Sequence, residues 1–197
     1  ARELSNQYDE IMVDEYQDTN ATQDALFSAL SKDESNLFYV GDVKQSIYAF
    51  RGANPLNFLS KKNSHIDVEN ANETDPKKIV LKNNFRSCSD VCDYINYFFK
   101  IFMHTETGGI VYDSDEELVA TADFPETDEL AVSVDIIDTK NAEENLVIEA
   151  RRIANYISET MASSPNIRVD KNNLRNAKYG DFAILLRNVK NKAGVIV

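Results

Sequence analysis

Two neighbouring acids, Asp14 and Glu15, follow a short apolar run and are the first candidates for chemistry in the chain. Carboxylates directly after a buried strand of an α/β sheet lie at the edge where such sheets bind ligands. One carboxylate can hold Mg²⁺ while its neighbour accepts a proton from an attacking water, as in phosphoryl transfer. An Asp-Glu pair is also common on ordinary protein surfaces, so its meaning depends on the residues around it.

Three unusual strings occur in order along the first half of the chain. Residues 14–20 are Asp-Glu-Tyr-Gln-Asp-Thr-Asn, residues 40–53 are Val-Gly-Asp-Val-Lys-Gln-Ser-Ile-Tyr-Ala-Phe-Arg-Gly-Ala, and residues 84–87 are Asn-Phe-Arg-Ser. They resemble motifs II, III and IV of the UvrD/Rep group of superfamily 1 DNA helicases.

Further strings narrow this resemblance to the AddA family, which provides one of the two subunits of the bacterial ATP-dependent helicase/nucleases called AddAB. These strings are residues 41–48 and 84–87, then Gly-Ile-Val-Tyr-Asp at 109–113 and Tyr-Gly-Asp-Phe-Ala-Ile-Leu-Leu-Arg at 179–187. The resemblance is strong over the first hundred residues and looser beyond them.

The resemblance implies a role for each residue of the first string. Asp14 would bind Mg²⁺, and Glu15 would activate the water that attacks the γ-phosphate of ATP. Gln17 and Asp18 would brace this loop and couple it to motion. In the second string, Gln45 matches the position that senses the γ-phosphate, and its amide can donate to a phosphate oxygen or orient the water.

The third string supplies two further nucleotide contacts by the same resemblance. Arg86 matches the finger that reaches the γ-phosphate from a second motor domain, and its fixed charge and fork of donors suit the transition state. Phe85 stands where many relatives have a Tyr stacked on adenine, and a phenyl ring keeps the stacking while losing the hydroxyl.

Residues 48–51 match positions that touch single-stranded DNA in the family. Tyr48 and Phe50 can stack on bases and Arg51 can hold a phosphate, which is recognition without sequence preference. The alternative is that Phe50 packs in the core and Tyr48 caps it. Lys44 is expected on the DNA side or in solvent.

The chain departs from the family pattern because no G-x-x-x-x-G-K-[ST] string occurs, so the loop that cradles the phosphates is missing. The late arginine motif and the nuclease pattern of the AddA family are also absent. We therefore expect an internal fragment that is inactive by itself. Residues 1–77 would be the later part of a first RecA-like domain, and residues 78–197 the opening part of a second.

The pattern of apolar residues predicts the α/β fold class, with parallel sheets flanked by helices. Short apolar runs predict buried strands, and 3.6-residue periodicity predicts amphipathic helices. The predicted strands are residues 11–13, 37–40, 78–82, 132–136 and 181–187, and the predicted helices are residues 21–30, 55–59, 87–102 (with Ser87 as its N-cap) and 146–157.

Two stretches are predicted to lie on the surface. Residues 63–76 are rich in Asn, Asp, Ser and Glu, with almost nothing to bury. Between Lys100 and Lys140 there is no Lys or Arg while 11 acids occur. We therefore expect an acidic excursion at residues 104–130, most simply a solvated loop.

Composition restricts the classes of function. The 197 residues are 43% hydrophobic and 27% charged, a composition that excludes general disorder. The formal charge of -12 excludes a chain wrapped in nucleic acid over its whole surface but allows a local basic groove. No run of 18 apolar residues and no signal-peptide pattern occurs, so no membrane role is expected. Cys88 and Cys92 are expected to be buried thiols of a reducing compartment, the cytoplasm. His65 and His104 stand alone, which argues against zinc.

The resemblance implies a parent protein that couples Mg-ATP hydrolysis to 3′-to-5′ translocation on single-stranded DNA. It would act on double-stranded DNA during break repair and recombination, with nuclease activity and a nuclease partner, AddB. One alternative is a UvrD/PcrA-type repair helicase without a nuclease. The other is a non-catalytic module, derived from a helicase, that binds DNA or a protein.

Overall fold

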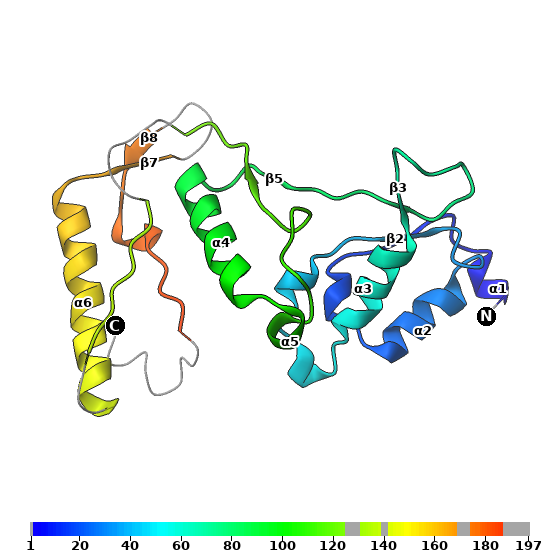
Figure 1. Cartoon of the computed structure of the whole chain (residues 1–197), viewed down its shortest axis with the longest axis horizontal. Coiled ribbons are helices and arrows are strands. Elements are labelled where there is room, and N and C mark those ends of the chain that lie inside the picture. Colours follow the sequence, from blue (N-terminus) through cyan, green and yellow to red (C-terminus); the bar gives the residue numbers. More distant parts are fainter. Residues whose placement is uncertain (1, 125–130, 139–141, 169–173, 187–197) are drawn as a thin grey trace. The chain divides into compact units, whose positions relative to one another are not determined.

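The structure, a computed structural model, describes residues 2–124, 131–138, 142–168 and 174–186 (Figure 1). The chain forms two compact units, Ala1–Ala122 and Asp123–Val197. Among the described residues, helices are mixed with short pairs of strands, and three of these pairs are parallel. The predicted mixed α/β class with small parallel sheets is therefore confirmed.

The first unit contains the parallel pair β1 (Ile11–Val13) and β2 (Leu37–Tyr39), with Ile11 opposite Leu37. Helix α2 (Ala21–Leu30) connects the two strands, as the sequence predicts. Asn20 caps the start of this helix, because its side chain accepts hydrogen bonds from two backbone N–H groups of the first turn, each at 3.0 Å. These three elements confirm the first part of the predicted order.

Tyr16 is the centre of the small core beneath this strand pair. Its side chain is fully buried, and its ring lies 4.3 Å from that of Tyr39 and 5.7 Å from that of Phe58, centroid to centroid. The Tyr16 hydroxyl donates a hydrogen bond to Asp24, and burial together with this bond raises the pKa of Tyr16. Tyr16 therefore ties the loop after β1 to α2 and to α3 (Pro55–Ser64).

Two very short parallel strand pairs follow α3, and the second of them includes a strand that comes after the next long helix. Strand β3 (Ile66–Asp67) pairs with β4 (Lys77–Lys78), and β5 (Asn83–Asn84) pairs with β6 (Val119–Ala120). The predicted surface connection at 63–76 therefore contains a strand, and the predicted strand at 78–82 is wrong beyond its first residue. Residues 79–82 have no neighbouring strand in the described parts of the chain, and Leu81 is left 87% exposed.

Helix α4 (Ser89–Phe102) confirms the strongest predicted helix. Its N-cap is Cys88 and not the predicted Ser87, because Ser87 belongs to the preceding turn. In that turn the Asn84 side chain accepts the backbone N–H groups of Arg86 and Ser87, at 2.9 and 2.8 Å. Cys92 is buried, as predicted, whereas Cys88 is only half-buried, and both cysteines are free thiols.

The segment after α4 corrects the predicted acidic excursion. It begins with the short helix α5 (Thr105–Gly108), and Ile110, Tyr112 and Glu116 are all buried. The buried amide of Asn96 on α4 holds this segment through three bonds: it accepts from the Tyr112 hydroxyl (2.8 Å) and from the Leu118 N–H (2.9 Å), and it donates to the Leu118 carbonyl (2.9 Å). The segment 110–118 is therefore anchored to the fold by buried residues, although residues 113–115 are exposed, and the part of the prediction at 125–130 lies outside the described residues.

The second unit is built around α6 (Ala142–Ala162), which confirms and extends the predicted helix at 146–157. The antiparallel pair β7 (Asn166–Arg168) and β8 (Leu174–Asn176) was not predicted. The strands predicted at 132–136 and 181–187 are wrong over their described residues, which pair with no described strand. Ile136 and Leu185 are consequently 92% and 95% exposed; Arg187 lies outside the described residues.

An ion pair between Arg175 and Asp181 joins β8 to the turn that follows it. Asp181 lies in the 3₁₀ turn Tyr179–Asp181 and accepts two hydrogen bonds from the Arg175 guanidinium, at 2.6 and 2.7 Å. The Arg175 guanidinium and the Lys178 backbone N–H lower the pKa of Asp181 to about 2. The Asp181 carboxylate is therefore ionised throughout the neutral range.

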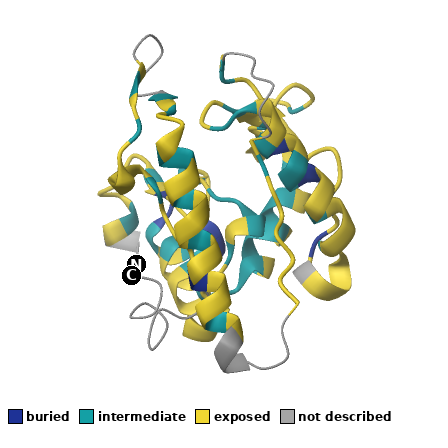
Figure 2. Ribbon diagram, turned by 90° about the vertical axis from the view of Figure 1, so that its left-hand side faces the viewer, coloured by how far each residue is buried: buried dark blue, intermediate teal, exposed yellow. Residues whose placement is uncertain are grey.

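Much of the described chain is exposed (Figure 2), and many of its large apolar side chains are among the exposed residues. On one face of the β1–β2 pair, Met12 and its partner Phe38 are 71% and 56% exposed. Parallel strands are normally covered on both faces, so this face of the pair lacks the usual cover. Of the helices in the described parts, none has the length and apolar character needed to cross a membrane.

Candidate functional site

The loops that follow β1 and β2 meet at one edge of the parallel pair. The backbone N–H of Tyr16 donates to the Val40 carbonyl at 2.9 Å, and the Val40 N–H donates to the Val13 carbonyl at 2.8 Å. Because the two strands are parallel, their carboxyl ends share this edge. The first two motif strings, 14–20 and 40–53, are therefore adjacent in space.

Gln17 links these two loops through its side chain. The side chain is only 1% exposed; its amide nitrogen donates to Glu15 Oε2 at 2.6 Å, and its amide oxygen accepts from the Asp42 backbone N–H at 3.0 Å. A buried amide that is bonded through both its nitrogen and its oxygen fixes the orientation of both partners. The structure thus brings together Glu15, Gln17 and the start of the second motif.

Glu15 has a left-handed backbone, with φ 49° and ψ 43°. A residue with a side chain reaches this region at some energetic cost, and such conformations occur where the surrounding structure holds them. Here the Glu15 N–H donates to Asp14 Oδ1 at 2.9 Å, and Gln17 holds the carboxylate. Both Asp14 and Glu15 are exposed and thus accessible to a ligand. Asp18, at the end of the same turn, has one buried carboxylate oxygen with no partner among the described residues.

Asp42 organises the second loop, although it was not among the predicted site residues. One carboxylate oxygen accepts the Lys44 backbone N–H (3.0 Å) and faces the Lys44 ammonium (2.9 Å), and the other accepts the Gln45 amide (3.0 Å). Burial opposes ionisation of Asp42, but the bonds from Lys44 and Gln45 outweigh it and hold its pKa below the usual value. Its place directly before the 3₁₀ turn Val43–Gln45 is the signal that marks it as a cap.

Lys44 is neither free in solvent nor turned to an open face. Its ammonium lies 2.6 Å from Glu116, which also pairs with Lys62. Burial would lower the pKa of Lys44, but its bonds to Glu116 and Asp42 raise it above its usual value. Sequence reasoning missed Glu116, because its partners lie 72 and 54 residues away along the chain.

Arg86 and Phe85 are both exposed at the turn before α4. Phe85, 71% exposed, lines an open hollow of about 510 Å³ together with residues 80–83. Within the described residues no hydrogen bond or ion pair joins the Arg86 side chain to Glu15 or Gln45. The meeting of Arg86 with the other catalytic candidates stays a prediction.

The predicted DNA-contacting residues form one cluster. The rings of Tyr48 and Phe50 lie 5.9 Å apart, and the Arg51 guanidinium carbon is 5.2 Å from the Tyr48 centroid and 5.5 Å from that of Phe50. Phe50 is 78% exposed, so the alternative that it packs in the core is wrong. Two exposed aromatic faces beside a cation are available for stacking.

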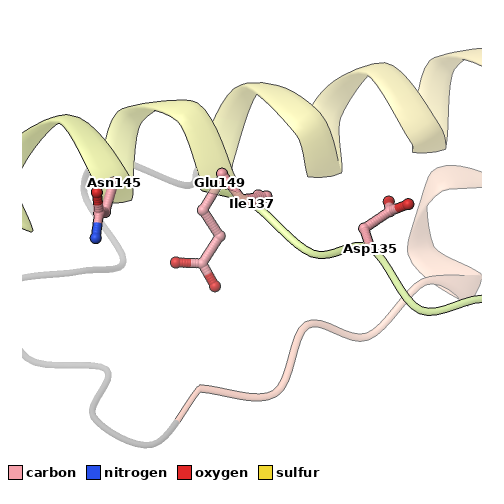
Figure 3. Close-up of a pocket in the computed structure, with 4 residues that line it drawn as sticks. All are labelled: Asp135, Ile137, Asn145 and Glu149. Atoms are coloured by element: carbon pink, nitrogen blue, oxygen red, sulfur yellow. The ribbon is translucent and has the colours of Figure 1, made fainter. Parts of the chain in front are cut away.

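A hollow in the second unit holds none of the predicted site residues (Figure 3). Its volume is about 250 Å³, and it is lined by Asp135 and Ile137 of the extended segment and by Asn145 and Glu149 of α6. Asp135 is already paired with Arg152 at 2.9 Å. Neighbouring acids without a further observation do not make a site, so we assign no function to this hollow.

The donor set at residues 14–15 fits Mg²⁺ bound mainly by nucleotide and water. No group of three or more His, Cys, Asp or Glu side chains able to hold a metal occurs in the described ranges. Mg²⁺ commonly takes one or two carboxylates and fills its remaining positions with water and phosphate oxygens. The exposed carboxylate of Asp14 meets that requirement.

Gly41→Ala should destabilise the first unit, because Gly41 leaves no room for a side chain. A Cβ at this position would lie 2.5 Å from Gln17 Oε1, 3.0 Å from the Phe58 ring and 3.2 Å from the Tyr16 nitrogen. We expect a loss of about 2 kcal/mol in the free energy of unfolding, as for overpacking generally. Urea unfolding followed by tyrosine fluorescence measures it. The control is Gly180→Ala, where no atom lies within 4 Å; equal stability of the two variants would contradict the close packing at Gly41.

Comparisons with known proteins confirm the predicted resemblance. Residues 1–66 match the UvrD/REP helicase N-terminal domain. The chain is 37% identical, over 99% of its length, to an ATP-dependent helicase/nuclease subunit of Clostridium acetobutylicum, and 41% identical over 96% of its length to the corresponding protein of Bacillus pumilus. It covers only 17% and 16% of these two relatives. The corresponding protein of Desulforamulus reducens is 43% identical over 73% of the chain.

Proposed function

We propose that this chain is the central part of an ATP-driven DNA motor. The premise is that the chain is similar almost throughout to ATP-dependent helicase/nuclease subunits of the AddA family. Residues 1–77 would belong to a first RecA-like domain and residues 78–197 to a second. The boundary falls inside the first compact unit, where β3 and β4 pair across it. The uncovered face at Met12 and Phe38 supports a larger parent domain.

The observation that carries the proposal is the side-chain path from Glu15 through Gln17 to the loop of Asp42 and Gln45. Gln17 bonds both Glu15 and the Asp42 backbone, and Asp42 bonds Gln45. Two groups predicted from separate motifs to act on one γ-phosphate therefore lie on a single connected pair of loops. A change in one loop would be transmitted to the other through these bonds.

In the proposed mechanism each residue has one task. Glu15 accepts the proton of the attacking water. Because the Gln17 amide donates a hydrogen bond to Oε2 of Glu15, Oε1 of Glu15 is the oxygen that faces the water. Gln45 contacts the γ-phosphate, and Arg86 stabilises its developing charge from the second domain. Bound Mg²⁺, held by Asp14, would neutralise charge on the phosphate oxygens. The exposed ring of Phe85 would stack on the adenine.

Movement along DNA would follow from closure around ATP and release after hydrolysis. The cluster of Tyr48, Phe50 and Arg51 would stack on bases and hold a phosphate of the strand. Since Arg51 and Gln45 are six residues apart in the same motif, the state of the nucleotide can reach the DNA contacts over a short path. The 3′-to-5′ polarity, the nuclease activity and the AddB partner are carried over from the resemblance.

Hydrolysis of ATP with and without single-stranded DNA tests the proposal. We expect DNA-stimulated turnover from a longer protein that carries the phosphate loop, and none from the 197-residue chain alone. Without that loop the nucleotide loses its backbone and lysine contacts, while the carboxylates of Asp14 and Glu15 repel its phosphates. DNA-stimulated turnover by the isolated chain would refute the expectation; a longer protein without turnover would favour the non-catalytic alternative.

A further inference from the structure

Lysine side chains gather beneath the acidic run at residues 113–117, a set we call the lysine surface: Lys44, Lys62, Lys82 and Lys100. Three consecutive acids of the run bind it. Asp115 lies 3.0 Å from Lys82, Glu116 lies 2.6 Å from Lys44 and also pairs with Lys62, and Glu117 lies 2.9 Å from Lys100. The acidic run is therefore seated on a concentration of positive charge.

This positive charge is unusual for the chain, whose formal charge is -12. The side chains of the lysine surface remain between 19% and 50% exposed, so the run only partly covers them. The electrostatic effect of the lysines extends beyond single ion pairs. The hydrogen bond from Lys82 lowers the pKa of Asp115 most, and the charges of Lys62 and Lys78 lower this pKa further. A local basic surface is thus present and is occupied by anions of the same chain.

We propose that the lysine surface binds the phosphates of single-stranded DNA and that the acidic run is an internal competitor for it. Carboxylates and phosphates accept the same ammonium hydrogen bonds, so one can replace the other. The choice of DNA rests on the proposed function. It is supported by continuity along the chain, because Lys44 lies four residues before Tyr48 and seven before Arg51.

Because the acidic run is anchored at both ends, it can move away from the lysines without unfolding of the segment. Tyr112 and Leu118, on either side of the run, are held by Asn96 on α4. Asp115 and Glu117 keep about half and a third of their side-chain surface in water. Only the tip between the two anchors needs to move for a strand to reach the lysines. The released lysines then exchange carboxylates for phosphates, with release of counterions from the DNA.

The test is binding of a fluorescein-labelled single-stranded oligothymidylate to the 197-residue chain, measured by fluorescence anisotropy without nucleotide. The variant Asp115→Asn with Glu116→Gln should bind about tenfold more tightly than the unmodified chain at low salt. Its plot of log affinity against log salt should be steeper by about 1.5, as expected when two lysines, Lys62 and Lys82, become available to a single strand while Lys44 stays paired with Asp42.

Three further variants make the result specific. Glu69→Gln with Glu73→Gln removes the same charge from two exposed acids outside the run and should change affinity little. Adding Lys62→Ala and Lys82→Ala to the first variant should remove the gain. The third variant, Asp115→Asn with Glu117→Gln, leaves the buried Glu116 in place. It serves as the test if the loss of charge at Glu116 prevents folding, and it should bind DNA about threefold more tightly than the unmodified chain.

Equal binding by the run variants and the Glu69/Glu73 control would overturn the proposal, as would a gain that survives loss of Lys62 and Lys82. Absence of DNA binding in every variant would overturn it too. The assay contains no ATP, so these outcomes do not depend on whether Glu15 and Arg86 catalyse hydrolysis. The two proposals can therefore fail separately.

Discussion

Glu15→Gln in a longer protein that contains this chain should reduce ATP hydrolysis by roughly 10²–10⁴-fold while leaving binding of Mg-ATP and DNA largely intact. The amide has nearly the shape of the carboxylate but cannot accept the proton of the attacking water. The loss therefore belongs to the chemical step and should appear in kcat.

The bond from Gln17 lets this substitution remove the carboxylate without disturbing the loop. Gln17 donates to Glu15 Oε2, and the oxygen of a glutamine at position 15 can accept the same bond. The loop should therefore keep its position. Steady-state hydrolysis and binding of a fluorescent ATP analogue are the measurements, with Glu10→Gln, an exposed acid beside β1, as the matched control. Undiminished turnover by Glu15→Gln would assign the general base to another residue.

Arg86→Ala should lower the hydrolysis rate by about a thousandfold or more in the same longer protein. Among the described residues the guanidinium makes no ion pair, so its loss removes no salt bridge from this part of the fold. The stability of the variant should accordingly change little. Arg86→Lys should not restore the rate, because an ammonium lacks the fork of donors that a phosphoryl group accepts.

The control for Arg86 is Arg151→Ala, which removes an exposed arginine of α6 that the proposed mechanism does not use. Hydrolysis and thermal unfolding are measured on both variants. A loss of stability in Arg86→Ala that accounts for the lost rate would make Arg86 a structural residue, and a normal rate would exclude it as the finger.

Elements with a strong internal pattern were predictable from the sequence. Helix α2 has a capping residue and an apolar face within one short segment, and α4 repeats its apolar residues along its whole length. The β1–β2 pair follows from two apolar runs joined by that first helix. The site residues of the loop that holds Asp14, Glu15 and Gln17 were predicted in another way, through the resemblance to helicase motifs, and their roles stay predictions.

Features that depend on distant partners were not predictable. The run at residues 113–117 has the composition of a solvated loop, but Asn96 holds the residues on either side of it and lysines far away in the sequence pair with its acids. Conversely, residues 132–136 have the alternation of a strand but find no strand to pair with in the described chain. Strand formation requires backbone hydrogen bonds to a neighbour, which a local pattern does not supply.

The central claim is that Glu15, Gln45 and Arg86 act on one phosphate. The most direct measurement is a structure of the longer protein with Mg²⁺ and a non-hydrolysable ATP analogue. We predict the Arg86 guanidinium and the Gln45 amide about 3 Å from γ-phosphate oxygens, and the Glu15 carboxylate hydrogen-bonded to a water in line with the γ-phosphate. Nucleotide bound in this way but with Arg86 directed to solvent, or with Glu15 turned from the γ-phosphate, would contradict the account.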